Sequence, residues 1–426
     1  SVKDTAKKLA DGIFSAYKDY LQPGETVGLF SESGEPYWWY EAGLVWNSLV
    51  EYSYLTGDKQ YDDIVSEALV WQIGQAGNAP YQPANQTRTE ANEDQIVWAL
   101  AALTAAETGF KEPKNIKWLD LAKGVFDAQT QRWDGETCGG GLRWQMLTFN
   151  AGYDWKNSAT NAAFFLLSAR LAAVTGNKTY SEWAEKSYKW SRDVGLISES
   201  YDVFDGTNVR SGCSDVTKSQ WTSVHAMYIE GSASRNSTFP AEGLATRFRD
   251  KFISEPEKVL VEAACEERNI CDTSMRFLKG IAARFLWRAG ATSTPVSDAL
   301  DASLRESAKK AAQECEGQGT ELTCRFVWAG ENREKSKVAE GGLPEVFNAL
   351  SVVQGRLYKK AGANASAGGS PVINPSASPS GGSPSGSPSG TPTGFTAPPQ
   401  GTGAAGRITV AWIGATLAAM LFAAGM

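Results

Sequence analysis

The chain has 426 residues, of which 42% are hydrophobic, so it is long enough to bury a large core. Its formal net charge of -7 at pH 7 argues against a nucleic-acid-binding protein, which would need a basic stripe. The 15 Trp and 14 Tyr residues suit a site that binds carbohydrate, where flat rings cover sugar faces, but they also suit packing between helices.

Apolar residues recur at spacings of three and four through almost the whole folded part, which predicts an all-α fold. Each run ends at a polar or glycine-containing stretch, which sets the expected ends of the helices. We expect twelve helices, over residues 2–20, 37–56, 59–77, 92–109, 115–132, 156–176, 178–194, 217–234, 239–253, 272–290, 295–314 and 341–360.

The connections between these helices alternate in length. Short turns follow the even-numbered helices, as at Thr56-Gly57-Asp58 and Thr175-Gly176-Asn177, where glycine supplies a left-handed cap. Long connections precede the even-numbered helices, so these helices should all begin at one end of the molecule. Repeated hairpins of this kind predict an (α/α)6 toroid of six helical hairpins, with an open solenoid as the alternative.

Two adjacent carboxylates stand at the start of the fourth expected helix, in the stretch Asn92-Glu93-Asp94-Gln95. Alpha-carbons of adjacent residues lie about 3.8 Å apart. Their carboxyl groups can therefore reach the separation of about 5 to 5.5 Å that retaining glycosidases use. Glu93 and Asp94 are thus candidates for acid/base and nucleophilic chemistry, and the alternative is that they only complement the helix dipole.

Aromatic, amide and acidic residues accompany this pair at the same expected end of the molecule. Such a mixture can stack on sugar rings and bind sugar hydroxyls, or it can simply pack the loops. The candidates for substrate binding are Trp38, Trp39, Asn92, Gln95, Trp144, Gln145, Asn157, Asp205 and Trp221.

Six cysteines lack the C-x-x-C spacing of thiol zinc sites, so we expect three disulfides. The short spacings pair Cys265 with Cys271 and Cys315 with Cys324, which leaves Cys138 with Cys213. Disulfides indicate an oxidising compartment and a secreted protein. Glycosylation sequons, which fit secretion, begin at Asn85, Asn177, Asn236 and Asn364.

The composition changes after the last expected helix. We expect residues 1–360 to form one domain and residues 361–406, rich in Ser, Gly, Pro and Thr, to form a disordered stalk. Residues 407–426 are an apolar tail that favours a glycosylphosphatidylinositol (GPI) signal, with cleavage between Ser389 and Gly403, over a tail-anchoring transmembrane helix. We also expect that a signal peptide has been removed before Ser1.

Three segments carry a resemblance to a known family: Asn92-Glu93-Asp94-Gln95, the segment from Cys138 to Gln145, and Tyr153-Asp154-Trp155-Lys156-Asn157. The chain resembles glycoside hydrolase family 76, and within it the fungal GPI-anchored mannan endo-1,6-alpha-mannosidases of the cell wall. The likeness covers residues 1–360 and includes the cysteine layout and the tail.

The resemblance implies an α toroid and a retaining mechanism on α-1,6-mannan or the mannose of a GPI core. It implies that two consecutive aspartates act as nucleophile and acid/base, at the positions of Glu93 and Asp94. Glu93 departs from that pattern by one methylene group. The acceptor is water or, as implied for the fungal relatives, a β-glucan hydroxyl. We expect a monomer, anchored to the membrane or cell wall, that needs no cofactor or metal.

The sequence favours three other functions less. A wall-anchored protein that binds mannan without turnover is the main alternative, because of the longer Glu93 side chain. A Ser-His-Asp hydrolase is disfavoured, because the single histidine, His225, lies inside an apolar helical stretch. A metal enzyme lacks a histidine pair, although bound calcium stays open.

Overall fold

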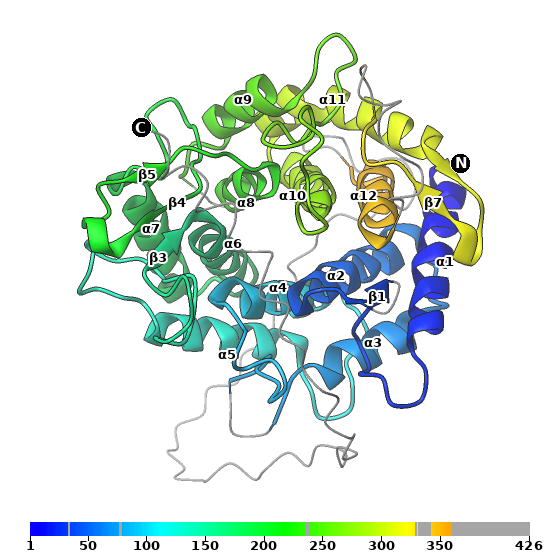
Figure 1. Cartoon of the computed structure of the whole chain (residues 1–426), viewed down its shortest axis with the longest axis horizontal. Coiled ribbons are helices and arrows are strands. Elements are labelled where there is room, and N and C mark those ends of the chain that lie inside the picture. Colours follow the sequence, from blue (N-terminus) through cyan, green and yellow to red (C-terminus); the bar gives the residue numbers. More distant parts are fainter. Residues whose placement is uncertain (33–34, 76–78, 235–237, 329, 331–341, 360–426) are drawn as a thin grey trace.

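The computed structural model describes residues 1–32, 35–75, 79–234, 238–328, 330 and 342–359. Within these ranges the chain forms twelve α-helices that alternate between an inner and an outer ring (Figure 1). The inner helices are α2 (Trp39–Thr56), α4 (Asn92–Thr108), α6 (Ser158–Thr175), α8 (Thr222–Ala233), α10 (Leu278–Thr292) and α12 (Leu343–Gln354). The outer helices are α1 (Val2–Tyr20), α3 (Asp62–Trp71), α5 (Trp118–Gln131), α7 (Lys178–Asp193), α9 (Ala241–Phe252) and α11 (Thr294–Gln313).

The inner ring is closed. Each inner helix contacts the next one along the chain, and α12 returns to contact α2. The predicted (α/α)6 toroid is therefore confirmed, and the open solenoid is excluded.

The two rings differ in sequence for a physical reason. Inner helices are surrounded by protein, so α4 buries an unbroken run from Gln95 to Ala105. Outer helices face solvent on one side, so α7 buries Tyr180, Ala184 and Tyr188 at a spacing of four residues, and leaves Glu182, Glu185 and Lys186 exposed. A helix that is apolar on every side can only belong to the interior.

The repeated turns have the expected geometry. Gly57, Gly109 and Gly176 end α2, α4 and α6 with φ angles of 79°, 66° and 68°. Glycine takes this left-handed conformation without the steric cost that a Cβ would add. These caps reverse the chain into the next outer helix.

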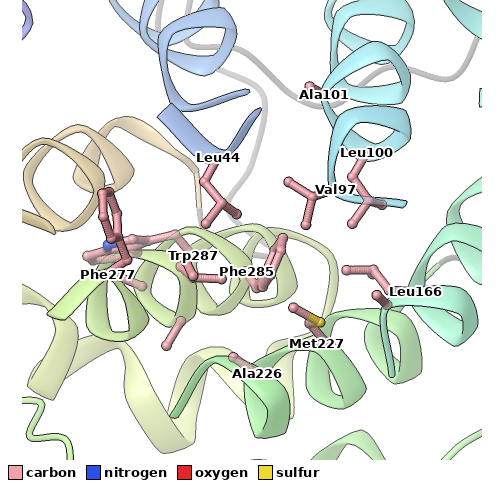
Figure 2. Packing of buried hydrophobic residues seen from close by; sticks show 14 of the residues in the cluster. Leu44, Val97, Leu100, Ala101, Leu166, Ala226, Met227, Phe277, Phe285 and Trp287 are labelled. Carbon is pink, nitrogen blue, oxygen red and sulfur yellow. The ribbon is translucent and has the colours of Figure 1, made fainter. Parts of the chain in front are cut away.

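Side chains from the inner helices meet in the middle of the ring. Figure 2 shows Leu44, Val97, Leu166, Met227 and Phe285, from five different inner helices, pointing toward one another. All five are nearly fully buried. This contact area fixes the inner helices relative to one another and hence places the residues at their ends.

A buried ion network connects the later parts of five inner helices. Arg288 donates to Glu107 and to Glu230, at 2.5 and 2.8 Å. Arg170 also binds Glu107, at 2.6 Å, and a further pair joins Arg284 to Glu51 at 2.7 Å. Since the charges are paired at short range, the desolvation penalty of burying them is offset.

Short strands lie in the long connections, and sequence patterns did not predict them. They form a β1–β2 hairpin, a three-stranded sheet in the order β3–β4–β5, and a β6–β7 hairpin. All the pairs are antiparallel. The strands are β1 (Ser31–Glu32), β2 (Glu35–Pro36), β3 (Trp155–Asn157), β4 (Gly206–Asn208), β5 (Val216–Thr217), β6 (Cys315–Glu316) and β7 (Thr323–Cys324).

Some helix ends differ from the prediction. The helix expected over 59–77 covers only Asp62–Trp71, because the chain turns afterwards and Gly74 is left-handed, with φ of 93°. The helix expected over 272–290 begins as a 3-10 turn, Met275–Phe277, before α10. Short 3-10 segments also occur at Val209–Ser211, Gly319–Glu321 and Gly355–Leu357.

The structure forms the three expected disulfides, Cys138–Cys213, Cys265–Cys271 and Cys315–Cys324. Of the sequon asparagines, Asn85 and Asn177 are exposed, and Asn236 and Asn364 lie outside the described residues. The expected stalk and apolar tail also lie outside them. In the part of the chain that is described, no helix combines the length and the apolar character needed to cross a bilayer.

Candidate active site

The inner helices all begin at one end of the toroid, which we call the site face. The long connections that carry the short strands lead into these helix starts. Unpaired backbone N–H groups and the helix dipole make such starts attractive to carboxylates. Glu93 and Asp94 occupy the second and third positions of α4 on this face.

Asp94 turns back onto its own helix start. Its Oδ2 accepts the backbone N–H of Ala91, the residue before α4, at 2.8 Å. Asp94 therefore satisfies one backbone N–H at the helix start that would otherwise lack a partner. This contact fits the alternative interpretation, in which the acidic pair complements the helix start. One carboxyl oxygen is engaged in this way, and the residue as a whole is only half-buried.

Glu93 extends toward the neighbouring inner helix. The hydroxyl of Thr160, in the first turn of α6, donates to Glu93 Oε2. The side chain of Trp144 and the Glu93 backbone N–H also hydrogen-bond to this carboxyl group. Donors of this kind favour the ionised carboxylate.

The two carboxyl groups influence each other's protonation. Burial raises the pKa of Glu93, and the charge of Asp94 raises it further. Burial also raises the pKa of Asp94, and the charge of Glu41 adds to this effect. Groups that interact this strongly titrate as a pair. The site thus favours a state in which one carboxyl is ionised and its neighbour holds a proton.

A third carboxyl group lies at the start of α2. Glu41 is 1% exposed, and its Oε1 accepts the hydroxyl of Ser274 at 2.7 Å. Its Oε2 accepts the Trp38 backbone N–H at 2.8 Å. Burial raises the pKa of Glu41 to about 7. The adjacent Tyr40 phenol lies within the field of Glu41, Asp94 and Glu93, which together with burial raises its pKa well above the usual value.

A fourth carboxyl group, Glu90, lies behind the acidic pair. It is 2% exposed, and neither of its oxygens hydrogen-bonds to a described residue. Burial raises the pKa of Glu90 to about 9, Asp94 adds to the increase, and Arg132 opposes it. Glu90 is therefore a neutral acid at neutral pH.

Two predicted binding residues contact each other further around the site face. The Trp221 indole N–H, at the start of α8, donates to Asp205 Oδ1 at 3.0 Å. Both residues are half-buried, and burial raises the pKa of Asp205. Trp38, which precedes α2, is 60% exposed and is free to meet a ligand.

Other predicted binding residues serve the protein framework instead. Trp39 is in the core, where it stacks on Trp98 with ring centroids 5.3 Å apart and donates to Gln72. Gln95 is fully buried and accepts from Gln129 and Arg132. Both assignments to a sugar-binding surface are corrected, because successive helical residues point about 100° apart.

Three more of the predicted residues act through local contacts. Asn92 donates to the Arg143 carbonyl oxygen at 2.9 Å and is 2% exposed. Gln145 is 8% exposed and accepts from Asn150 at 3.0 Å. Asn157 caps α6 by accepting the Thr160 N–H at 3.0 Å, and so it fixes the residue that contacts Glu93.

The loop that carries Trp144 is held by a buried lysine. Lys156 is 0% exposed, and its ammonium group donates to the carbonyl oxygens of Asp134, Thr137 and Gly140. It also pairs with the Asp134 carboxylate at 3.1 Å. The Trp144 carbonyl oxygen in turn accepts the N–H of Asn92 at 2.9 Å. This hydrogen bond joins the loop directly to the start of α4.

The sequence analysis did not single out Thr160, Ser274, Tyr40 or Glu41. Thr160 is 67 positions from Glu93, and only the ring brings α6 beside α4. The sequence could have indicated Thr160 as a site residue, because it lies in the first turn of an inner helix and these helices all begin on the site face. Among the described residues, no group of three or more His, Cys, Asp or Glu side chains could hold a metal ion.

Residues 1–367 match the sequence model of glycosyl hydrolase family 76. The mannan endo-1,6-alpha-mannosidase DCW1 of Saccharomyces cerevisiae is 37% identical over 383 residues, covering 87% of this chain and 83% of the yeast protein. The mannan endo-1,6-alpha-mannosidase DFG5 of the same yeast is 33% identical over 385 residues, covering 86% and 82%.

Solved structures agree with this match. The crystal structure of Dfg5 from Chaetomium thermophilum, in complex with glucosamine, has a TM-score of 0.76 and 34% identity over 84% of this chain and 90% of that one. An inactive variant of an alpha-1,6-mannanase from Salegentibacter, in complex with alpha-1,6-mannotetrose, has a TM-score of 0.65. It is 16% identical over 84% and 99% of the two chains, which supports the fold. The chain belongs to glycosyl hydrolase family 76.

Proposed function

We propose that the protein is a retaining endo-α-1,6-mannosidase or transglycosylase that acts on α-1,6-mannan or on GPI-core mannose in fungal cell-wall biogenesis. The observation that carries the proposal is the acidic pair itself. Burial raises the pKa of both carboxyl groups, and the charge of Asp94 raises that of Glu93 further, so the pair keeps a proton near neutral pH. Donors from α6 and from the Trp144 loop hold Glu93 in position. We assign the nucleophile to Glu93 and the acid to Asp94 in the order that the family resemblance implies. The names of the fungal relatives support the substrate class.

In the first step the Glu93 carboxylate attacks the anomeric carbon of an α-1,6-linked mannose. The bond to the glycosidic oxygen breaks, and Asp94 gives its proton to that oxygen as it leaves. The product is a glycosyl ester on Glu93. Thr160 and Trp144 hold the attacking carboxylate in position by their hydrogen bonds.

In the second step Asp94, now ionised, takes a proton from an acceptor hydroxyl. The acceptor oxygen bonds to the anomeric carbon, and the ester to Glu93 breaks. Water as acceptor gives hydrolysis, and a β-glucan hydroxyl gives transglycosylation. Trp38, Trp144, Asp205 and Trp221 are the predicted binding residues that the structure leaves available to contact a sugar.

We further propose that residues 361–406 form a stalk and that residues 407–426 are a GPI signal. The three disulfides support an extracellular location. The anchor would hold the catalytic domain, residues 1–360, at the outer face of the membrane or in the wall. Product and substrate would then both be wall polymers.

A second candidate is a wall-anchored protein that binds mannan without turnover. The observation that favours it is Glu93, whose carboxyl group stands one methylene further from the helix than that of the aspartate implied by the family resemblance. A displacement of about 1 Å can cost about 100-fold in rate. The two candidates share the binding surface and differ only in chemistry.

Turnover distinguishes them. Purified full-length protein in detergent is incubated with linear α-1,6-manno-oligosaccharides, and the products are followed by mass spectrometry and by NMR of the first anomeric proton. The enzyme predicts products with α configuration, and a loss of at least about 1,000-fold in rate for Glu93→Gln or Asp94→Asn, with binding retained. Binding without products would leave only the second candidate.

A further inference from the structure

Carboxylates recur at one position of the inner ring. Glu41, Asp94 and Glu345 are the third residues of α2, α4 and α12. Each accepts the backbone N–H of the residue three positions earlier, at 2.8, 2.8 and 2.9 Å respectively. The same position therefore carries the proposed acid on α4 and its structural equivalents on the other two helices.

Glu41 is the equivalent residue next to Asp94. Helix α2 contacts α4 on one side and α12 on the other, so Glu41 lies between the other two carboxylates in ring order. At 1% exposure Glu41 is too buried to touch a sugar. Any effect of Glu41 on the reaction must therefore pass through its neighbours.

The hydrogen bonds decide which carboxyl group ionises first. Glu41 accepts from the Ser274 hydroxyl at 2.7 Å, from the Trp38 backbone N–H at 2.8 Å and from the Tyr40 hydroxyl at 3.4 Å. Asp94 accepts a single backbone N–H. Because donors stabilise the charged form, a negative charge is placed more readily on Glu41 than on Asp94.

We propose that Glu41 is a positioning residue of the reaction, whose charge on the neighbouring inner helix keeps the proton on Asp94 until the leaving glycosidic oxygen takes it. This inference rests on the proposed function, because it assumes that Asp94 is the acid. It assigns a task to a buried carboxyl group that the two reaction steps do not use.

The surrounding groups support this task. Asp94 faces Glu93 on its own helix, Glu90 from the preceding loop, and Tyr40 and Glu41 from α2. Glu41 itself faces Tyr40, Ser274 and the negative charge of Asp272. Arg132 contributes positive charge near Glu90. Negative charge on Glu41 therefore opposes the ionisation of Asp94.

The test compares the pH dependence of kcat/KM for the full-length wild type and for Glu41→Gln, which keeps the acceptor for the Trp38 N–H. We expect the alkaline limb to move to lower pH by about one unit, because removal of a nearby charge releases the Asp94 proton earlier. At about pH 5, below that limb, kcat should stay close to the wild-type value. KM should change little, since Glu41 does not touch the substrate.

Glu345→Gln is the matched control, because it removes the same carboxylate from the same position one helix further from α4. Its alkaline limb should stay at the wild-type pH. An unmoved limb in Glu41→Gln, or an equal movement in the control, would overturn the inference. If Glu41→Gln does not fold, Ser274→Ala removes a donor to Glu41 and should move the limb in the same direction by a smaller amount.

A second readout separates this inference from the proposed function. The protein is labelled with 13C at the aspartate carboxyl carbons, and the Asp94 resonance is assigned by its absence in Asp94→Asn. Its titration midpoint should be lower in Glu41→Gln than in the wild type. A wild type without turnover would end the proposed function, whereas an unchanged midpoint would end only the inference about Glu41.

Discussion

The hydroxyl of Thr160 donates a hydrogen bond to Oε2 of Glu93, so the carboxylate that projects from α4 is held by the neighbouring inner helix α6. Asn157 fixes the Thr160 backbone by capping α6. The position of Glu93 therefore depends on the packing of two helices as well as on its own side-chain conformation.

Thr160→Val removes this donor and keeps the shape of the side chain. We expect kcat to fall about tenfold to 100-fold, because a hydrogen bond to a charged group contributes about 1.5–3 kcal/mol. The acidic limb of the rate profile should also move to higher pH, since Glu93 loses a group that favours its ionised form. Thr160→Ser should retain most of the rate, and an equal loss in both variants would contradict the assignment.

Glu93→Asp tests whether the longer side chain is required. Thr160 and Trp144 contact the carboxyl group at the end of a glutamate, and an aspartate would withdraw it from both. We expect kcat to fall by about 100-fold for a displacement of about 1 Å. If Glu93→Asp were as fast as the wild type or faster, the site would be built for the aspartate that the resemblance implies.

Sequence patterns predicted the ring and its twelve helices because the inner helices are largely apolar and the short turns after α2, α4 and α6 begin with glycine. They singled out Glu93 and Asp94 as candidates because an acidic pair at a helix start is a local feature. They failed for Trp39 and Gln95, since proximity along a helix does not determine which side a residue faces. They missed Thr160, because its contact with Glu93 arises only when the ring closes.

Glu90 makes stability depend on pH. An unfolded glutamate has a pKa of about 4.3, whereas burial raises the pKa of Glu90 to about 9 in the folded chain. Between these values the folded chain keeps a proton that the unfolded chain has released, so the free energy of unfolding falls as pH rises. The contribution of Glu90 to the free energy of unfolding is fully present below the unfolded pKa of about 4.3 and is lost as pH rises toward the folded value.

Glu90→Gln removes this dependence. We expect the variant to be more stable than the wild type at about pH 8, by on the order of 2 kcal/mol, and to differ little at about pH 4. Urea denaturation at both values measures the difference. A stability difference that is the same at both pH values would show that Glu90 does not titrate in this window.

Lys156→Met tests the anchor of the Trp144 loop. The substitution leaves Asp134 without its buried ammonium partner and leaves three carbonyl oxygens without their shared donor. We expect a loss of about 3–5 kcal/mol in the free energy of unfolding. Lys189→Met, which breaks an exposed pair with Asp193, should cost less than about 1 kcal/mol. Similar losses in both variants would contradict the anchoring role.

The most direct test of the proposed mechanism is to trap the glycosyl ester. The full-length protein is incubated with a 2-deoxy-2-fluoro mannosyl donor, which slows breakdown of the ester in retaining enzymes, and is then mapped by peptide mass spectrometry. We predict one adduct, on the peptide that contains Glu93, and none in Glu93→Gln. Release of mannan products from the wild type together with an adduct on another residue, or with an inverted anomeric product, would contradict the mechanism.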